Sequence, residues 1–259
     1  MQKAIILVSF GTTYEEARRL CIDSIEDRIR EEFRGIHIFR AYTSRIIINI
    51  LKKRDNYLVD NLEEALIRAT SSGVYNIYIQ PLFVLPGKEY SKLKDQVKEF
   101  IIDNSKVNIQ VGKPLLGDDL DYDMVVRGLD SIYQDIAYDE GIVFMGHGCD
   151  PYTDKAYERL EQRFRQAGYP NVFIGTLKGR KTIDEIIPTL QGLGIKKVKL
   201  MPFMFFAGSH ATNDMVSGKD SWQDKLLSSG IRVEPIIMGL GQIKEIQDIY
   251  INHLDILNI

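Results

Sequence analysis

Apolar residues are distributed along this chain in two alternating patterns. Short continuous apolar runs are typical of buried parallel strands, and stretches with apolar residues every three or four positions are typical of helices packed on a sheet. The first run covers residues 4–10 and is broken by Gly11. A capping-box pattern, Thr13-x-x-Glu16, then predicts the start of a helix. Its expected buried stripe is Ala17, Cys21, Ile25, Ile29 and Phe33.

The same alternation continues to the end of the chain. Further strands are predicted at 36–41, 74–85, 107–111, 142–145, 172–177, 197–204 and 233–238. Pro81 is expected to mark the carboxyl end of its strand. Helices are predicted over 46–54, 62–69, 93–101, 122–134 and 215–227, and from residues 151, 183 and 243 onward. Strands that alternate with helices predict an α/β fold with mostly parallel sheets and right-handed crossovers.

The two halves of the chain resemble each other. Residues 80–90 and 201–211 share the order strand, Pro, apolar run, Gly and a polar residue of ligand type, and residues 8–11 align with 145–148. We interpret this as two similar Rossmann-like lobes, 1–120 and 121–259, facing each other across a cleft. Whether the last helix packs on the N-terminal lobe is left open. Chance recurrence of a βαβ pattern is the alternative.

Composition narrows the class of protein. Of 259 residues, 44% are hydrophobic and 27% charged, which is typical of a folded globular chain. The net charge of −3 argues against binding nucleic acid by phosphate neutralisation. Cys21 and Cys149 are too few for a disulfide framework and form no CxxC zinc motif. With no signal-peptide pattern and no run of about 18 apolar residues, we expect a cytoplasmic protein without membrane contact.

Candidate functional residues follow the predicted strands, because ligands of open α/β sheets bind beyond the carboxyl ends of the strands. His147 lies between two glycines after one strand, and His210 follows Gly-Ser after another. Imidazole binds divalent metals and takes up protons near neutral pH, so both are candidate functional residues. Glu89, after a strand of the first half, is a third ligand, a proton acceptor or a solvated carboxylate. His37 and His253 are expected to be structural or solvated.

Common nucleotide and hydrolase motifs are missing from the sequence: there is no GxGxxG, no P-loop and no GxSxG elbow. From the residues alone, the prediction stops at a two-lobed α/β protein with a histidine-lined metal site.

Several longer motifs indicate a family. Along almost its whole length, the chain resembles the anaerobic cobalt chelatases of the CbiK type. The resemblance rests on residues 8–12, 39–44, 143–148, 200–204, 207–215 and 220–222. It implies a bilobal chelatase fold that holds sirohydrochlorin in the cleft and inserts a divalent metal, with cobalt expected, during anaerobic cobalamin biosynthesis. The metal is a substrate, and no organic cofactor is implied. His147 and His210 match the family's active-site histidines, and Glu89 matches an acidic position.

The resemblance suggests roles that the residue types can fill. Insertion requires removal of two pyrrole protons while the metal moves from protein ligands to the ring nitrogens. Imidazole suits both tasks, so we assign His147 as base and His210 as principal ligand, with Glu89 passing protons outward. Candidates for contact with the polycarboxylate substrate are Ser9, Phe10, Lys88, Arg45, Arg54 and Lys178. An iron or nickel chelatase and a non-catalytic tetrapyrrole- or metal-binding relative remain alternatives, and homo-oligomerisation is left open.

One position departs from the family pattern. Where the family commonly places a glutamate as a third metal ligand, this chain has Lys178, followed by Gly179 and Arg180. A protonated amine cannot ligate a metal and repels a cation. Either Glu89 replaces the missing carboxylate, or Lys178 and Arg180 hold substrate carboxylates, or the protein has a different task.

Overall fold

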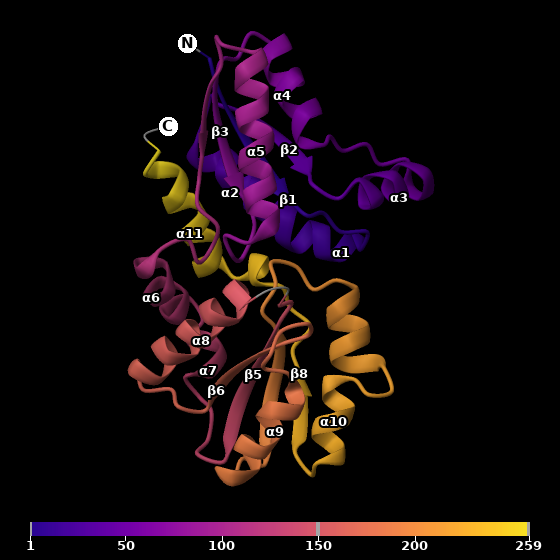
Figure 1. Ribbon diagram of the computed structural model, residues 1–259, viewed down its shortest axis with the longest axis vertical. Coiled ribbons are helices and arrows are strands. Elements are labelled where there is room, and N and C mark those ends of the chain that lie inside the picture. Colours follow the sequence, from indigo (N-terminus) through magenta and orange to yellow (C-terminus); the bar gives the residue numbers. More distant parts are fainter. Residues whose placement is uncertain (1, 149–150, 258–259) are drawn as a thin grey trace. The chain divides into compact units, whose positions relative to one another are not determined.

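The computed structural model describes residues 2–148 and 151–257, and Cys149 lies outside the described residues. The chain divides into two compact units, residues 1–117 with 247–259, and residues 118–246. The division drawn from the sequence was 1–120 and 121–259. Each unit contains a four-stranded parallel sheet with helices on both sides (Figure 1).

The first unit follows the predicted order of strands and helices. Its elements are β1 (Lys3–Ser9), α1 (Glu15–Ala17), η1 (Arg18–Asp23), α2 (Ser24–Glu32), β2 (His37–Tyr42), α3 (Arg45–Asp55), α4 (Leu62–Ser71), β3 (Asn76–Pro81), α5 (Lys88–Asp103) and β4 (Asn108–Val111). The strand order is β2-β1-β3-β4. As predicted, β3 ends at Pro81, which has no N–H to extend the ladder.

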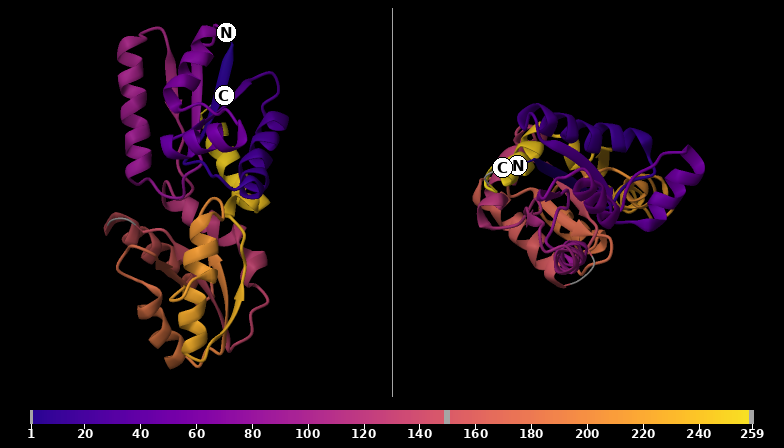
Figure 2. Two further views of the ribbon diagram at one scale, coloured as in Figure 1. Left: turned by 90° about the vertical axis from the view of Figure 1, so that its right-hand side faces the viewer. Right: turned by 90° about the horizontal axis from the view of Figure 1, so that it is seen from above.

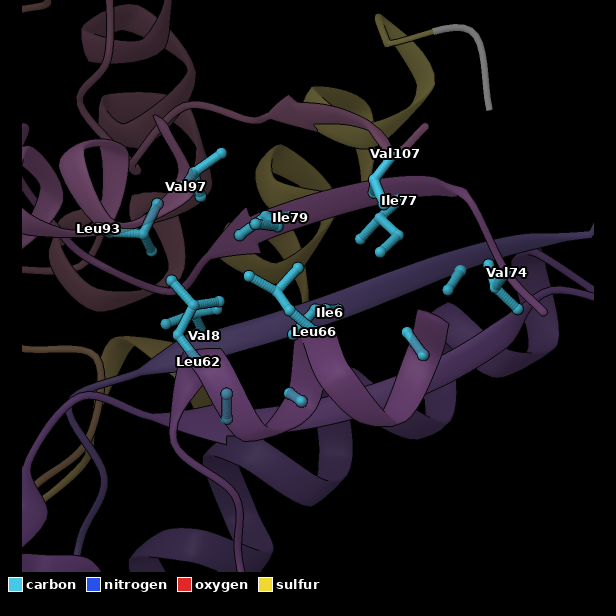
Figure 3. Close-up of a cluster of buried hydrophobic side chains, with 14 residues drawn as sticks. Ile6, Val8, Leu62, Leu66, Val74, Ile77, Ile79, Leu93, Val97 and Val107 are labelled. Carbon is cyan, nitrogen blue, oxygen red and sulfur yellow. The ribbon is translucent and has the colours of Figure 1, made fainter. Parts of the chain in front are cut away.

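Helices cover both faces of this first sheet. On one face, α4 and α5 bury Leu66 and Leu93 against Ile6, Val8 and Ile79 (Figure 3). On the other face lie α2 and the end of α11 (Lys244–Asp255). There Gln247 donates to the Ser24 hydroxyl, and Figure 2 shows α11 on the side of the sheet opposite α5.

The second unit repeats this arrangement. It contains α6 (Asp119–Gly128), α7 (Asp130–Tyr133), β5 (Glu140–Gly146), α8 (Pro151–Gln166), β6 (Val172–Thr176), α9 (Ile183–Gly192), β7 (Lys197–Pro202), η2 (His210–Ser217), α10 (Trp222–Ser228), β8 (Arg232–Pro235), η3 (Leu240–Gln242) and the start of α11. The order is β6-β5-β7-β8. One face is covered by α9, α10 and η2, whose residues Ile186, Leu226 and Met215 pack with Val143 and Leu200.

The registers of the two sheets support an internal repeat. Val8 pairs with Pro81 in the first sheet, and Met145 pairs with Pro202 in the second. The residue after each proline donates its backbone N–H to the strand partner, Leu82 to Val8 at 2.7 Å and Phe203 to Met145 at 2.8 Å. The alignment of residues 8–11 with 145–148, and of the two proline-containing segments, therefore holds at the level of individual pairs.

Three predicted helices differ from those observed. Residues 15–32 form an α-helix interrupted by the π-helical η1, and it begins after Tyr14 without a side-chain cap, so the Thr13–Glu16 capping box is wrong. Residues 122–134 form two helices, which meet at Leu129. The helix predicted over 215–227 is the π-helical η2 followed by α10.

The π-helical turn in residues 18–23 has a sequence signal. Ala17, Cys21, Ile25 and Ile29 are all buried, and each follows the previous one by four residues. A strict spacing of four drifts around an α-helix of 3.6 residues per turn. Because the π-helical i→i+5 pattern is wider than the α-helical one, η1 offsets part of this drift and keeps the stripe on the sheet. Cys21 is thus a buried face residue, as predicted.

Candidate metal and tetrapyrrole site

Two histidines meet at the carboxyl ends of the central strands of the second unit. His147 follows β5, and His210 begins η2 after the loop that leaves β7. The centroids of their rings are 5.1 Å apart, with the ring planes at 73°. The prediction that the two glycine-associated strand ends bring these residues together is consistent with this geometry. His37 is exposed, and His253 is buried with its Nδ1 3.2 Å from the Lys113 carbonyl oxygen, so both fit the structural or solvated roles expected of them.

The hydrogen bonds of the two rings fix which nitrogen is free. His147 Nδ1 lies 3.0 Å from the Gly148 carbonyl oxygen, and His210 Nδ1 lies 2.6 Å from Asp214 Oδ2. Carbonyl and carboxylate oxygens only accept, so each Nδ1 carries the proton. The Nε2 atoms of the neutral rings therefore keep their lone pairs, which is the form of imidazole that binds a divalent metal.

The electrostatic surroundings of His147 favour its neutral form. Burial lowers the pKa of His147 below its ordinary value near 6.5, and the nearby His210 and Lys178 charges lower it further. The bond to Gly148 and the charge of Asp214 act in the opposite direction without reversing the shift. Around neutral pH, His147 is consequently available to bind a metal or accept a proton.

This shift can be measured by following the ring resonances of His147 with pH. We expect His147 to titrate below pH 6.5, and its pKa to rise in Lys178→Ala. The rise should be partial, because burial is the first cause. The folded state binds fewer protons here than the unfolded state, so this residue's contribution to the free energy of unfolding falls as pH drops below about 6.5. An unchanged pKa of His147 in Lys178→Ala would show that the charge of the Lys178 ammonium group does not affect His147.

Lys178 belongs to the loop that leaves β6, next to His147. Its backbone N–H donates to the His147 carbonyl oxygen at 3.1 Å, and Leu177 N–H donates to Gly146 O at 3.0 Å. The side chains of Lys178 and Arg180 are exposed. The structure therefore places an ammonium group beside His147, at the position where the resemblance implies a carboxylate.

Close packing under this loop explains the glycines around His147. A Cβ atom on Gly148 would lie 2.6 Å from Thr176 Cβ and 2.9 Å from Gly179 N. Gly148 also has φ of +62°, in the left-handed region. On the other side of His147, a Cβ on Gly146 would lie 2.7 Å from Tyr157 Cζ. Side chains at these positions would displace the backbone that carries the histidine.

Gly148→Ala should therefore both destabilise the second unit and weaken metal binding. We expect a loss of about 1–3 kcal/mol in the free energy of unfolding from overpacking, with further strain from the positive φ. Gly168→Ala is the matched control, because Gly168 also has a positive φ (+94°) but no neighbour within 4 Å of its Cβ position. Chemical denaturation measures the free energy of unfolding of both variants. Equal losses in the two variants would mean that crowding beneath His147 has no part in the effect.

The other candidate residues belong to the first unit. Ser9 is buried at the end of β1, and Phe10, the counterpart of His147 in the repeat, is 45% exposed. Lys88 and Glu89 begin α5, where Glu89 accepts from Lys92 at 2.9 Å. Roles for these residues in substrate or proton handling stay predictions.

Two arginines of the first unit, Arg45 and Arg54, lie at opposite ends of α3. Arg45 is exposed at its first turn. The Arg54 guanidinium donates to the Thr13 carbonyl oxygen at 2.6 Å and pairs with Asp55 at 2.7 Å, so it ties α3 to the loop after β1. Substrate contact by either arginine likewise stays a prediction.

In the described part of the second unit, no third protein ligand joins the histidine pair. Among its described residues, no group of three or more His, Cys, Asp or Glu side chains is arranged to hold a metal ion. Asp214 contacts the far side of the His210 ring, at Nδ1, and so is not directed at a metal on Nε2.

Comparison with known proteins identifies the family. Residues 3–257 match the family described as cobalt chelatase (CbiK). This chain belongs to the cobalt chelatase (CbiK) family. The resemblance deduced from the sequence, and with it the prediction of a metal chelatase, is confirmed.

Individual relatives agree with this assignment. The chain is 32% identical over 255 residues to a sirohydrochlorin cobaltochelatase of Salmonella typhimurium, covering 98% of this chain and 96% of the relative. It is 33% identical to the sirohydrochlorin cobaltochelatase CbiKC of Nitratidesulfovibrio vulgaris, covering 98% and 89%. The structure of SirB from Bacillus subtilis with Fe3+ superimposes with a TM-score of 0.68 at 14% identity, covering 98% and 95%. The predicted fold class, two Rossmann-like lobes of the chelatase type, is confirmed.

A transmembrane helix is missing from the described part of the chain: none of its helices combines the length and apolar character needed to cross a membrane.

Proposed function

We propose that this protein inserts Co(II) into sirohydrochlorin, the reaction named for its relatives, as a step of anaerobic cobalamin biosynthesis. The observation that carries the proposal is the pair of imidazoles, 5.1 Å apart between centroids, that present free Nε2 atoms at the strand ends of a CbiK-family chain. Imidazole nitrogen is a suitable ligand for Co(II) and binds Fe(II) and Ni(II) as well.

The two histidines divide the work in this proposal. His210, backed by the Asp214 carboxylate, is the principal ligand of the incoming ion. His147, whose pKa is lowered by burial, is neutral and accepts the two pyrrole N–H protons one after the other, releasing the first before it takes the second, as the metal enters the ring. The four ring nitrogens of the macrocycle then take the metal from these two imidazole nitrogens.

Basic side chains are proposed to hold the carboxylates of the substrate. Lys178 and Arg180 are exposed, and the charge of Lys178 is close enough to His147 to lower its pKa. From the first unit we propose Ser9, Phe10, Lys88, Arg45 and Arg54 as further contacts, with Glu89 as the residue that passes protons outward. A lysine beside a metal site weakens cation binding, but the same charge attracts a polycarboxylate, which accounts for Lys178 in place of glutamate.

The same lysine supports a second candidate, a tetrapyrrole- or metal-binding relative that has lost turnover together with its third ligand. Purified protein should be mixed anaerobically with sirohydrochlorin and Co(II), and the absorption change compared with the uncatalysed rate. Repeating the assay with Fe(II) and Ni(II) ranks the metals. A rate above background for Co(II) supports the chelatase. Binding of the tetrapyrrole without any rate above background, for all three metals, would favour the second candidate.

A further inference from the structure

The side of the His210 ring that faces away from the proposed metal position carries a carboxylate. Asp214 Oδ2 lies 2.6 Å from His210 Nδ1 and accepts its proton in a hydrogen bond. His147 has only the neutral Gly148 carbonyl oxygen in the equivalent place. The two histidines of the site therefore differ in the acceptor at Nδ1, which is a carboxylate for His210 and a backbone carbonyl oxygen for His147.

The backbone that carries this pair is firmly anchored. His210 and Asp214 are four residues apart on the π-helical η2, a rare conformation that is frequent at functional sites. On its inner side, Ala211 and Met215 are buried, and Met215 belongs to the core of the second sheet. Its outer side exposes His210 and Asp214, with 38% and 49% of their side chains accessible.

An exposed carboxylate could be a surface charge of no consequence, but its geometry here is specific. A free histidine ring can protonate either nitrogen and can rotate about its Cβ–Cγ bond. An acceptor fixed at Nδ1 removes both freedoms: it selects the Nδ1–H form and directs Nε2 the opposite way. Carboxylates in this relation to a metal-binding histidine also increase its strength as a ligand.

We propose that Asp214 is the positioning residue of His210, holding its ring in the Nδ1–H form with Nε2 directed at the entering metal ion. This inference rests on the proposed function only in taking His210 as a metal ligand. Asp214 itself touches neither metal nor tetrapyrrole. Replacing it should therefore change how His210 binds metal, while the fold and the contact of His147 Nδ1 with the Gly148 carbonyl oxygen are kept.

The test uses Asp214→Ala and Asp214→Glu in the full chain, with Asp184→Asn as control. Asp184 is an exposed aspartate on α9 of the same unit, and it forms a 2.6 Å ion pair with Lys225 on α10. Long-range 1H–15N correlation spectra report which ring nitrogen of His210 is protonated. A Co(II) titration followed by visible absorption, without tetrapyrrole, reports affinity.

For Asp214→Ala we expect His210 to lose the pure Nδ1–H signature and Co(II) affinity to fall by roughly 10–100-fold, the usual effect of removing such an outer partner. Asp214→Glu should recover part of both, and Asp184→Asn should leave both unchanged. An unchanged ring signature and unchanged affinity in Asp214→Ala would overturn the inference.

Both readouts are independent of turnover. Wild-type protein that binds Co(II) through His210 but does not insert it would refute the proposed function and leave the role of Asp214 standing. Turnover that survives intact in Asp214→Ala, with unchanged Co(II) affinity, would refute the role of Asp214 alone.

Discussion

Replacing His210 by alanine should reduce cobalt insertion into sirohydrochlorin by at least about 100-fold, the lower end of what a positioned ligand or base contributes. His210 supplies one of the two free Nε2 atoms of the site, and its loss leaves a single imidazole next to Lys178. His147→Ala should have an effect of similar size, since the base and the second nitrogen disappear together. Initial rates measured anaerobically at saturating sirohydrochlorin, over a range of Co(II) concentrations, separate loss of metal binding from loss of chemistry.

The matched control for these variants is His37→Ala. His37 is an exposed histidine at the start of β2, so its replacement removes an imidazole without touching the site. It should keep the wild-type rate. Retention of more than about half the wild-type activity by either His147→Ala or His210→Ala, at all metal concentrations, would contradict the assigned roles.

The second large effect is expected from Lys178→Glu. This change removes a positive charge near His147 and adds a carboxylate where the family pattern has a metal ligand. At an exposed position, each of these two changes in charge should improve the free energy of Co(II) binding by up to about 1 kcal/mol. Co(II) should therefore bind roughly 10–30-fold more tightly in the absence of tetrapyrrole. The pKa of His147 should also rise, because Lys178 is among the causes that lower it.

Tighter metal binding in Lys178→Glu should not increase the rate of cobalt insertion. If Lys178 holds a substrate carboxylate, Lys178→Glu should raise the KM for sirohydrochlorin, and kcat should stay level or fall because the ion leaves its protein ligands more slowly. Lys196→Glu is the control, since this exposed lysine precedes β7 at the opposite end of the same sheet. A clear gain in kcat for Lys178→Glu would instead identify the natural protein as a relative that lost its third ligand.

Much of the fold follows from local patterns in the sequence. The apolar runs predict β1, β5 and β7 to within about two residues at most ends, because strands buried on both faces have few polar positions to confuse the pattern. Pro81 ends its strand for the reason the sequence offers, a missing N–H, and Pro202 likewise ends β7, where the predicted strand ran on to residue 204. The π-helical turn at residues 18–23 was missed because its apolar stripe, which recurs every four residues, was interpreted as the face of a regular α-helix.

The candidate site was predicted in part. Glycine on both sides of His147, and Gly-Ser before His210, indicate strand ends where a side chain can meet a ligand, and the two rings do come together. The role of Asp214 was not visible, because an aspartate four residues after a histidine looks like an ordinary polar helix face. Its signal is the His-x-x-x-Asp spacing at the start of the helix that follows the loop after β7. Which groups lie against Lys178 depends on the path of the loop after β6, and no local pattern encodes that path.

A single-turnover experiment can follow the metal as it passes from the histidine pair to the tetrapyrrole. Protein loaded with one equivalent of Co(II) would be mixed anaerobically with one equivalent of sirohydrochlorin in a stopped-flow spectrometer, beside free Co(II) at the same concentration. The account predicts that the protein-bound Co(II) absorption disappears in step with the appearance of cobalt-sirohydrochlorin, faster than with the free ion. Transfer no faster than from free Co(II), or cobalt retained by the protein, would contradict it.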